Sequence, residues 1–230
     1  YVCRHLGRRG VVFMPVTTPQ QKIDKTRMFG GGMVEIRLVG DFFDECYRAV
    51  LDFADASGGL MVPPFDHRDI IEGQATVAHE IAAQMPEGVE PDLMVLPVGG
   101  GGLSAGVTRY FAERGAAPRF AFAEPLGAPS LKRSLAAGRR VKLDGVDNFV
   151  DGAAVAEIGK ENFRLLKDFD EAQVRLVPEN RLCATMIEML NIEGVVLEPA
   201  GALAIDALKD LPRKDIRGRT IACVVSGGNF

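Results

Sequence analysis

Short runs of apolar residues alternate along the chain with longer amphipathic segments, and this alternation constrains the fold more than any other feature. The short runs are continuously apolar, as in strands covered on both faces, whereas the longer segments repeat apolar residues at helical spacing. We expect strands at 11–14, 34–38, 60–62, 93–98, 119–123, 173–177 and 220–225, and helices at 19–29, 42–56, 70–84, 103–113, 179–190 and 200–208. The pattern predicts an α/β fold with parallel sheets flanked by helices.

The composition breaks in one region, where Ser57-Gly58-Gly59 is followed by Val62-Pro63-Pro64. We therefore expect two lobes, a small one at 1–58 and a large one at 59–230, because only the second has strands and helices enough for its own core. A cleft between such lobes commonly holds a small molecule. The chain opens on what looks like the end of a helix and stops just after an apolar run, so we expect both lobes to be partial and the fold to be incomplete at both ends.

Charge and cysteine usage narrow the class of protein. The sequence has 27 Lys and Arg against 31 Asp and Glu, a net charge of -4 without a basic stripe, which argues against a nucleic-acid partner. No apolar run approaches the roughly 20 residues of a membrane span. The 4 cysteines form no C-x-x-C pair and the 3 histidines lack the spacing of zinc ligands. We expect free thiols in the cytoplasm, no membrane contact and no metal.

A glycine run follows the apolar segment 93–98 and precedes a helical pattern. Residues without a Cβ let several backbone N–H groups converge on one anion, and the positive end of the next helix adds to the attraction. The lysine and hydroxyl of a nucleoside-triphosphate loop are missing. The run predicts a phosphate site at Gly99, Gly100, Gly101, Gly102 and Leu103.

The same run permits a second interpretation. Gly100-x-Gly102-x-x-Ala105 fits the loose dinucleotide fingerprint, and Glu124 stands where an acid could bind a ribose. On that interpretation the protein is a nicotinamide-dependent oxidoreductase. It leaves the C-terminal Ser226-Gly227-Gly228-Asn229 without a purpose, and we keep it as the alternative.

Several further motifs share one order and spacing with a known family. The chain resembles the threonine dehydratases, also called threonine ammonia-lyases, within the fold-type II pyridoxal-phosphate enzymes whose fold is like that of the tryptophan synthase β chain. The motifs are Phe13-Met14-Pro15, Thr17-Thr18-Pro19, Pro63-Pro64-Phe65-Asp66-His67, the glycine run, Asp151-Gly152, Glu198-Pro199-Ala200-Gly201-Ala202 and the C-terminal Ser-Gly-Gly-Asn. Any one of them is weak, but their shared order makes the resemblance strong.

This resemblance implies pyridoxal 5'-phosphate as the cofactor, with its phosphate on the glycine run. It also implies that Ser226 forms a hydrogen bond with the pyridine nitrogen, that Phe65 lies near the ring and that Gly152 lies along its edge. A neutral hydroxyl cannot keep that nitrogen protonated, which suits elimination better than transamination. Glu198 is the carboxylate that the resemblance puts near the cofactor and our candidate catalytic residue. A helix N-terminal charge ahead of Pro199 would explain it equally well.

Two departures from the family matter. The segment with the lysine that forms a Schiff base with the cofactor is absent, and Lys22 and Lys25 look like surface charges that we do not assign to that role. Whether that absence is a truncation is left open. The positions of a racemase-like cation site are Glu124, Ala128 and Ser130, where a hydroxyl replaces one charged ligand. We expect no metal there.

The resemblance predicts a lyase that dehydrates and deaminates L-threonine, and possibly L-serine, to 2-oxobutanoate and ammonia, in isoleucine biosynthesis or threonine catabolism. It also implies a homo-oligomer, a dimer or a tetramer. Without the lysine, we expect the 230-residue polypeptide alone to be inactive. The alternatives are the nicotinamide oxidoreductase, a non-catalytic remnant and, within the family, a serine or hydroxyaspartate dehydratase or a racemase.

Overall fold

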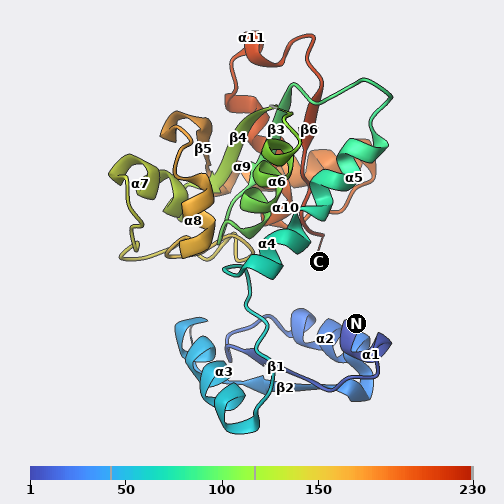
Figure 1. The fold of residues 1–230 in the computed structure, drawn as a ribbon, viewed down its shortest axis with the longest axis vertical. Coiled ribbons are helices and arrows are strands. Elements are labelled where there is room, and N and C mark those ends of the chain that lie inside the picture. The colour runs from blue at the N-terminus through green and yellow to red at the C-terminus, as the bar shows by residue number, and fades with distance from the viewer. Residues whose placement is uncertain (42, 117, 229–230) are drawn as a thin grey trace. The chain divides into compact units, whose positions relative to one another are not determined.

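The structure, a computed structural model, describes residues 1–41, 43–116 and 118–228. Figure 1 shows two compact units, Tyr1–Val62 and Pro63–Phe230, called unit 1 and unit 2 below. Both contain parallel strands joined through helices, so the expected α/β class with flanked parallel sheets is confirmed. Phe42, the first residue of an expected helix, lies outside the described residues.

Unit 1 has a two-stranded parallel sheet with Gly10 opposite Val34 and Met14 opposite Leu38. Helix α3 is fixed by aromatic contacts: the Phe13 and Phe53 rings lie 5.5 Å apart. In chain order the elements are α1 (Val2–His5), β1 (Gly10–Met14), α2 (Gln20–Gly30), the 3-10 helix η1 (Gly31–Met33), β2 (Val34–Leu38) and α3 (Phe43–Ser57).

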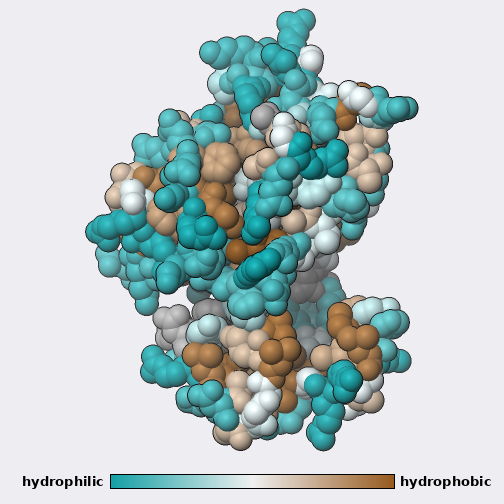
Figure 2. Space-filling model, in the orientation of Figure 1, coloured by the Kyte–Doolittle hydropathy of each residue, from teal (hydrophilic) through white to brown (hydrophobic). Residues whose placement is uncertain are grey.

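Large apolar side chains remain at the surface of unit 1, as Figure 2 shows. Such a small sheet with its helices cannot bury all of its apolar side chains. The exposed ones include Val16, Met28, Phe29, Leu38 and Leu51.

Unit 2 is built on a four-stranded parallel sheet in the order β5-β4-β3-β6. The strands are β3 (Leu93–Pro97), β4 (Arg119–Pro125), β5 (Val174–Val177) and β6 (Ile221–Cys223). Leu93 pairs with Arg119 on one side and with Ile221 on the other. All residues of β3 are buried, which explains the unbroken apolar run seen in the sequence.

Helices cover both faces of the unit 2 sheet. Met94 and Leu96 belong to a core that includes side chains of α4 (Arg68–Gln74), α5 (Thr76–Gln84), α6 (Gly102–Glu113), α7 (Ser130–Ala137) and α8 (Lys160–Leu166). Leu93 and Val95, on the opposite face of β3, pack with α9 (Glu179–Glu188) and α10 (Pro199–Ala207). No helix in the described ranges is long and apolar enough to cross a membrane.

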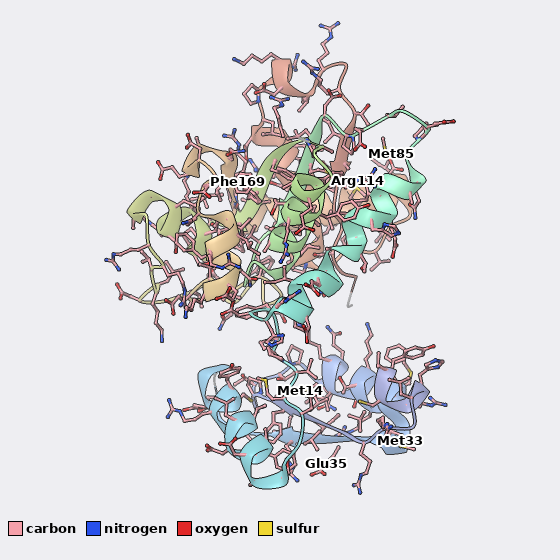
Figure 3. All side chains as sticks on the ribbon, viewed as in Figure 1. Met14, Met33, Glu35, Met85, Arg114 and Phe169 are labelled. Atoms are coloured by element: carbon pink, nitrogen blue, oxygen red, sulfur yellow. The ribbon has the colours of Figure 1, made fainter. Side chains whose placement is uncertain are left out.

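Short elements complete unit 2. They are the 3-10 helices η2 (Glu171–Gln173) and η4 (Leu208–Asp210), the π-helix η3 (Met189–Glu193) and α11 (Arg213–Ile216). Phe169, labelled in Figure 3, lies near η2. Its ring packs edge-on against Phe120 and Phe122, with centroids 5.7 and 5.0 Å away. This aromatic cluster fastens the segment before β5 to β4.

Some expected elements differ from the structure. The expected strand at 60–62 is wrong: this segment pairs with no strand, and Leu60 is 93% exposed. The expected helix at 70–84 is two helices, because Ala75 stands as a turn between α4 and α5. The helix expected at 179–190 ends at Glu188 and continues as the π-helix η3. Helices α7 and α8 were not expected.

Candidate functional site

A pocket of about 270 Å³ lies in unit 2, where β3 ends and α6 begins. Because the strands are parallel, this is the carboxyl edge of the sheet, where α/β proteins bind ligands. The pocket wall combines segments far apart in the sequence. Of the expected cofactor residues, it includes Phe65, Gly152, Ser226 and the whole glycine run 99–103. The structure thus brings together every expected cofactor-binding residue.

The glycine run needs glycine for two different reasons. Gly101 has φ +90°, in the left-handed region that other residues avoid. At Gly99 and Gly100 the reason is space: a Cβ on Gly99 would lie 2.9 Å from the Ala153 backbone, and one on Gly100 would overlap the Phe65 ring. The loop is therefore packed closely against the Ala153 backbone and the Phe65 ring.

The backbone of this loop fits an anion. The N–H groups of residues 99–103 donate no hydrogen bond to any group within 1–41, 43–116 or 118–228. Unpaired N–H groups at the start of a helix attract negative charge, and α6 begins at Gly102. The unpaired N–H donors, the four glycines that leave room for a ligand and the adjoining pocket fit the phosphate of pyridoxal phosphate.

A second segment, Phe65 and Asp66, is fixed beside the loop. The Phe65 ring lies against Gly100. The Asp66 carboxylate accepts hydrogen bonds from the backbone N–H groups of Lys160 and Glu161, each at 2.8 Å, and so caps α8. The cap therefore ties the pocket-lining segment at Phe65 to α8, which lies more than 90 residues later in the sequence.

Ser226 and Glu198 meet the pocket from the C-terminal side. The Ser226 hydroxyl donates to the Ala200 carbonyl at 3.5 Å, a long bond that a ligand acceptor could replace. Glu198 is half-buried and does not line the pocket, but a Cβ on Gly152 would lie 3.2 Å from its Oε1. It is also the N-cap residue of α10, directly before Pro199. Its catalytic role stays a prediction.

Glu124 is wrong as a ribose-binding acid, because it is fully buried. Its carboxylate accepts the N–H groups of Leu131 at 2.6 Å and Lys132 at 2.9 Å, which caps α7. Burial raises the pKa of Glu124 to about 7, against the opposing effect of these hydrogen bonds. The dinucleotide interpretation of the glycine run therefore lacks its acid.

The positions considered for a cation also belong to this cap. Ser130 is fully buried, and its hydroxyl lies 3.4 Å from Glu124 Oε1 as a donor. Among the described residues, no three His, Cys, Asp or Glu side chains gather as metal ligands would. The Glu124 oxygens face backbone N–H groups, which is an environment for an anion.

Lys22 and Lys25, expected to be surface charges, are each half-buried. Lys22 and Lys25 lie on α2 of unit 1. No lysine of the described chain lines the unit 2 pocket. Sequence reasoning missed Asn162, a fully buried amide that bonds to the Gly100 carbonyl at 2.7 Å. The only signal was an asparagine next to core-facing Phe163 in a short amphipathic segment.

Comparison with known proteins agrees with this geometry. The family model described as "Pyridoxal-phosphate dependent enzyme" matches residues 1–227. The curated L-threonine dehydratase biosynthetic IlvA of Bacillus subtilis (strain 168) is 43% identical over 229 residues, which cover 100% of this chain and 53% of that protein. The IlvA of Lactococcus lactis subsp. lactis (strain IL1403) is 40% identical over 230 residues, covering 100% and 55%.

Solved structures agree as well. The processed threonine deaminase isoform 2 from Solanum lycopersicum superposes with a TM-score of 0.86 at 34% identity, covering 99% of this chain and 64% of that one. Maize serine racemase gives a TM-score of 0.86 at 26% identity, covering 99% and 68%.

Fold and pocket together define a parallel α/β protein with a glycine loop of unpaired N–H groups at the carboxyl edge of its sheet. The chain belongs to the family of pyridoxal-phosphate dependent enzymes. It spans about half the length of the curated relatives it matches.

Proposed function

We propose that this chain is part of a threonine dehydratase, which converts L-threonine to 2-oxobutanoate and ammonia with pyridoxal phosphate and accepts L-serine as a second substrate. The observation that carries the proposal is the row of unpartnered N–H groups at 99–103 facing a ligand-sized pocket. The identity of 43% to a biosynthetic threonine dehydratase supports the choice of substrate. The reaction would serve isoleucine biosynthesis or threonine catabolism.

Pyridoxal phosphate, when bound, withdraws electrons from the α-carbon of an amino acid and makes its α-proton acidic. The N–H groups of the glycine loop hold the phosphate, and the N-terminus of α6 adds its positive end. The Phe65 ring packs on Gly100 and keeps water from that side of the loop. Cofactor orientation thus comes from backbone donors and one aromatic side chain.

Two side chains act on protons in this proposal. The Ser226 hydroxyl offers a neutral hydrogen bond to the pyridine nitrogen, which stays unprotonated, so loss of the β-hydroxyl is favoured over transamination. Glu198, whose carboxylate lies beside Gly152 and Gly227, would act as the general acid or base of the reaction. The 230-residue polypeptide alone is inactive on this proposal, because no lysine of the described chain lines the pocket.

The test is an assay of the full-length protein for 2-oxobutanoate released from L-threonine. L-alanine, which has no β-hydroxyl, is the matched control substrate and should release no keto acid by elimination. Threonine turnover lost in Ser226→Asp and kept in part by Ser226→Ala would support a neutral contact at the nitrogen. Full-length protein without threonine or serine turnover would refute the proposal. Light scattering of the same sample tests the expected homo-oligomer.

A further inference from the structure

Asn162 of α8 forms a hydrogen bond with the glycine loop without lining the pocket. Its side chain is fully buried, and Nδ2 donates to the Gly100 carbonyl at 2.7 Å and to the Phe65 carbonyl at 3.2 Å. These two carbonyls belong to two segments that line the pocket, the glycine loop and the segment that contains Phe65. The Asn162 amide therefore links the glycine loop to the segment that contains Phe65.

The orientation of this amide is set by its neighbours. Reversing it would place Oδ1 against two carbonyl oxygens, and oxygens without hydrogens cannot bond to each other. In the observed orientation Oδ1 is buried and has no partner in the described part of the chain. Leaving an acceptor unpaired is unfavourable, so Asn162 contributes through the two hydrogen bonds that it donates.

These bonds fix the Gly100–Gly101 peptide, which borders the pocket. The Gly100 carbonyl also accepts from the Gly159 N–H at 3.1 Å, so two donors hold it from the α8 side. In a trans peptide the N–H points opposite to the carbonyl. The N–H of Gly101 therefore points away from Asn162. Glycines on both sides would otherwise let this peptide rotate and turn its carbonyl toward the anion.

We propose that Asn162 is a positioning residue for the cofactor phosphate: it fixes the Gly100–Gly101 peptide so that its N–H is presented to the phosphate. The proposal rests on the pyridoxal-phosphate site of the proposed function and adds a residue that acts through the loop. Asn162 itself does not line the pocket. Its loss should weaken binding of the phosphate and leave the rest of the cofactor unaffected.

The test compares pyridoxal phosphate with pyridoxal, which lacks the phosphate, by absorbance titration of the full-length apoprotein. Asn162→Leu keeps the branched shape of the side chain and removes the donors. We expect about tenfold weaker binding of pyridoxal phosphate, with pyridoxal binding changed by less than about twofold, because the Gly101 N–H would lose its hydrogen bond to the charged phosphate. Asn162→Ala is the second variant, for use if Asn162→Leu does not fold.

Leu166→Ala is the matched control, since Leu166 is fully buried one turn further along α8 and makes no bond to the loop. It should lower stability and leave the preference for the phosphate ester unchanged. A folded Asn162 variant with the wild-type preference would overturn the proposal. A wild type without any preference would overturn both this role and the cofactor site. If the Asn162 variant loses the preference for pyridoxal phosphate but the wild-type protein does not turn over threonine, the positioning role of Asn162 is supported and only the proposed substrate is contradicted.

Discussion

Asp66 Oδ1 accepts a hydrogen bond from the backbone N of Glu161 at 2.8 Å, across 95 residues of sequence. Oδ2 accepts the N–H of Lys160 at the same distance. Asp66→Ala should therefore lower the free energy of unfolding by about 1–2 kcal/mol through loss of the α8 cap. Urea denaturation measures it. Asp168→Ala, an exposed aspartate just after α8, is the control and should change stability by less than about 0.5 kcal/mol. Equal effects would contradict the cap.

Gly100→Ala should disturb the Phe65 ring, because the new methyl group would overlap it. Overpacking of this kind lowers the free energy of unfolding by about 1–3 kcal/mol. Gly145→Ala is the control, since nothing lies within 4 Å of a Cβ there. Thermal or urea denaturation of both variants makes the comparison.

The cause can be isolated with a double mutant. If the ring is what the methyl group meets, Phe65→Ala removes the clash, and Gly100→Ala should cost less in that background than in the wild type. Additive losses would show that the two positions do not interact and would contradict the packing described here.

Glu124 makes stability depend on pH. Burial raises its pKa from an ordinary 4.5 to about 7. Between these values the folded state keeps a proton that the unfolded state has lost, so the free energy of unfolding falls as pH rises through this window. The fall is up to about 3 kcal/mol at complete ionisation. Urea denaturation at pH 4.5, 6 and 8 measures it.

Glu124→Gln should flatten that dependence, because an amide does not ionise in this range. Its oxygen can still accept the Leu131 N–H, whereas the Lys132 N–H loses its acceptor, so the variant is less stable at low pH. Glu80→Gln, at an exposed position, should keep the wild-type slope. An unchanged slope in Glu124→Gln would exclude Glu124 as its source.

Asp206 is the buried centre of an ion-pair network between α9 and α10. It is fully buried, and it accepts from Arg181 Nε and Thr185 Oγ1, each at 2.6 Å. Asp206→Ala should cost about 3 kcal/mol of unfolding free energy, since it removes the buried acceptor of both Arg181 Nε and Thr185 Oγ1. Asp210→Ala removes the outer partner of Arg181 and should cost about 1 kcal/mol or less. Chemical denaturation measures the unfolding free energy of both variants. Similar losses would contradict the claim that the buried Asp206 contributes more than the partly exposed Asp210.

The sheet of unit 2 could be predicted because its strands are continuously apolar, but the short helices α7 and α8 could not. Helix caps that signal an N-terminus are usually adjacent in sequence. Here α7 is capped by Glu124 from the preceding strand, and α8 by Asp66 from a distant segment. Neither helix carries its own start signal.

The errors at 60–62 and at Ala75 have a different origin. Residues 60–62 are apolar, but they form the segment that joins the two units, and nothing pairs with it. Helix α4 ends where Ala75 donates to Ile71 and Glu72 in a turn, although the apolar spacing continues into α5. Apolar periodicity indicates which face of a helix is buried. It does not reveal a break between two helices when both bury the same face.

The glycine loop was predictable because its chemistry is local: adjacent residues without side chains present adjacent N–H groups. Asn162 was not, because its bonds to Gly100 and Phe65 span 62 and 97 residues. Only the packed structure shows which buried amide lies behind the loop.

Gly106 is buried where α6 crosses α4, and a Cβ there would overlap the Ile71 carbonyl and lie 2.8 Å from Ala75 N. Helix α6 continues directly from the glycine loop, and α4 begins shortly after Phe65 and Asp66. A methyl group at Gly106 would act as a wedge between the two helices and spread both walls of the pocket. Cofactor affinity thus depends on Gly106, although Gly106 does not line the pocket.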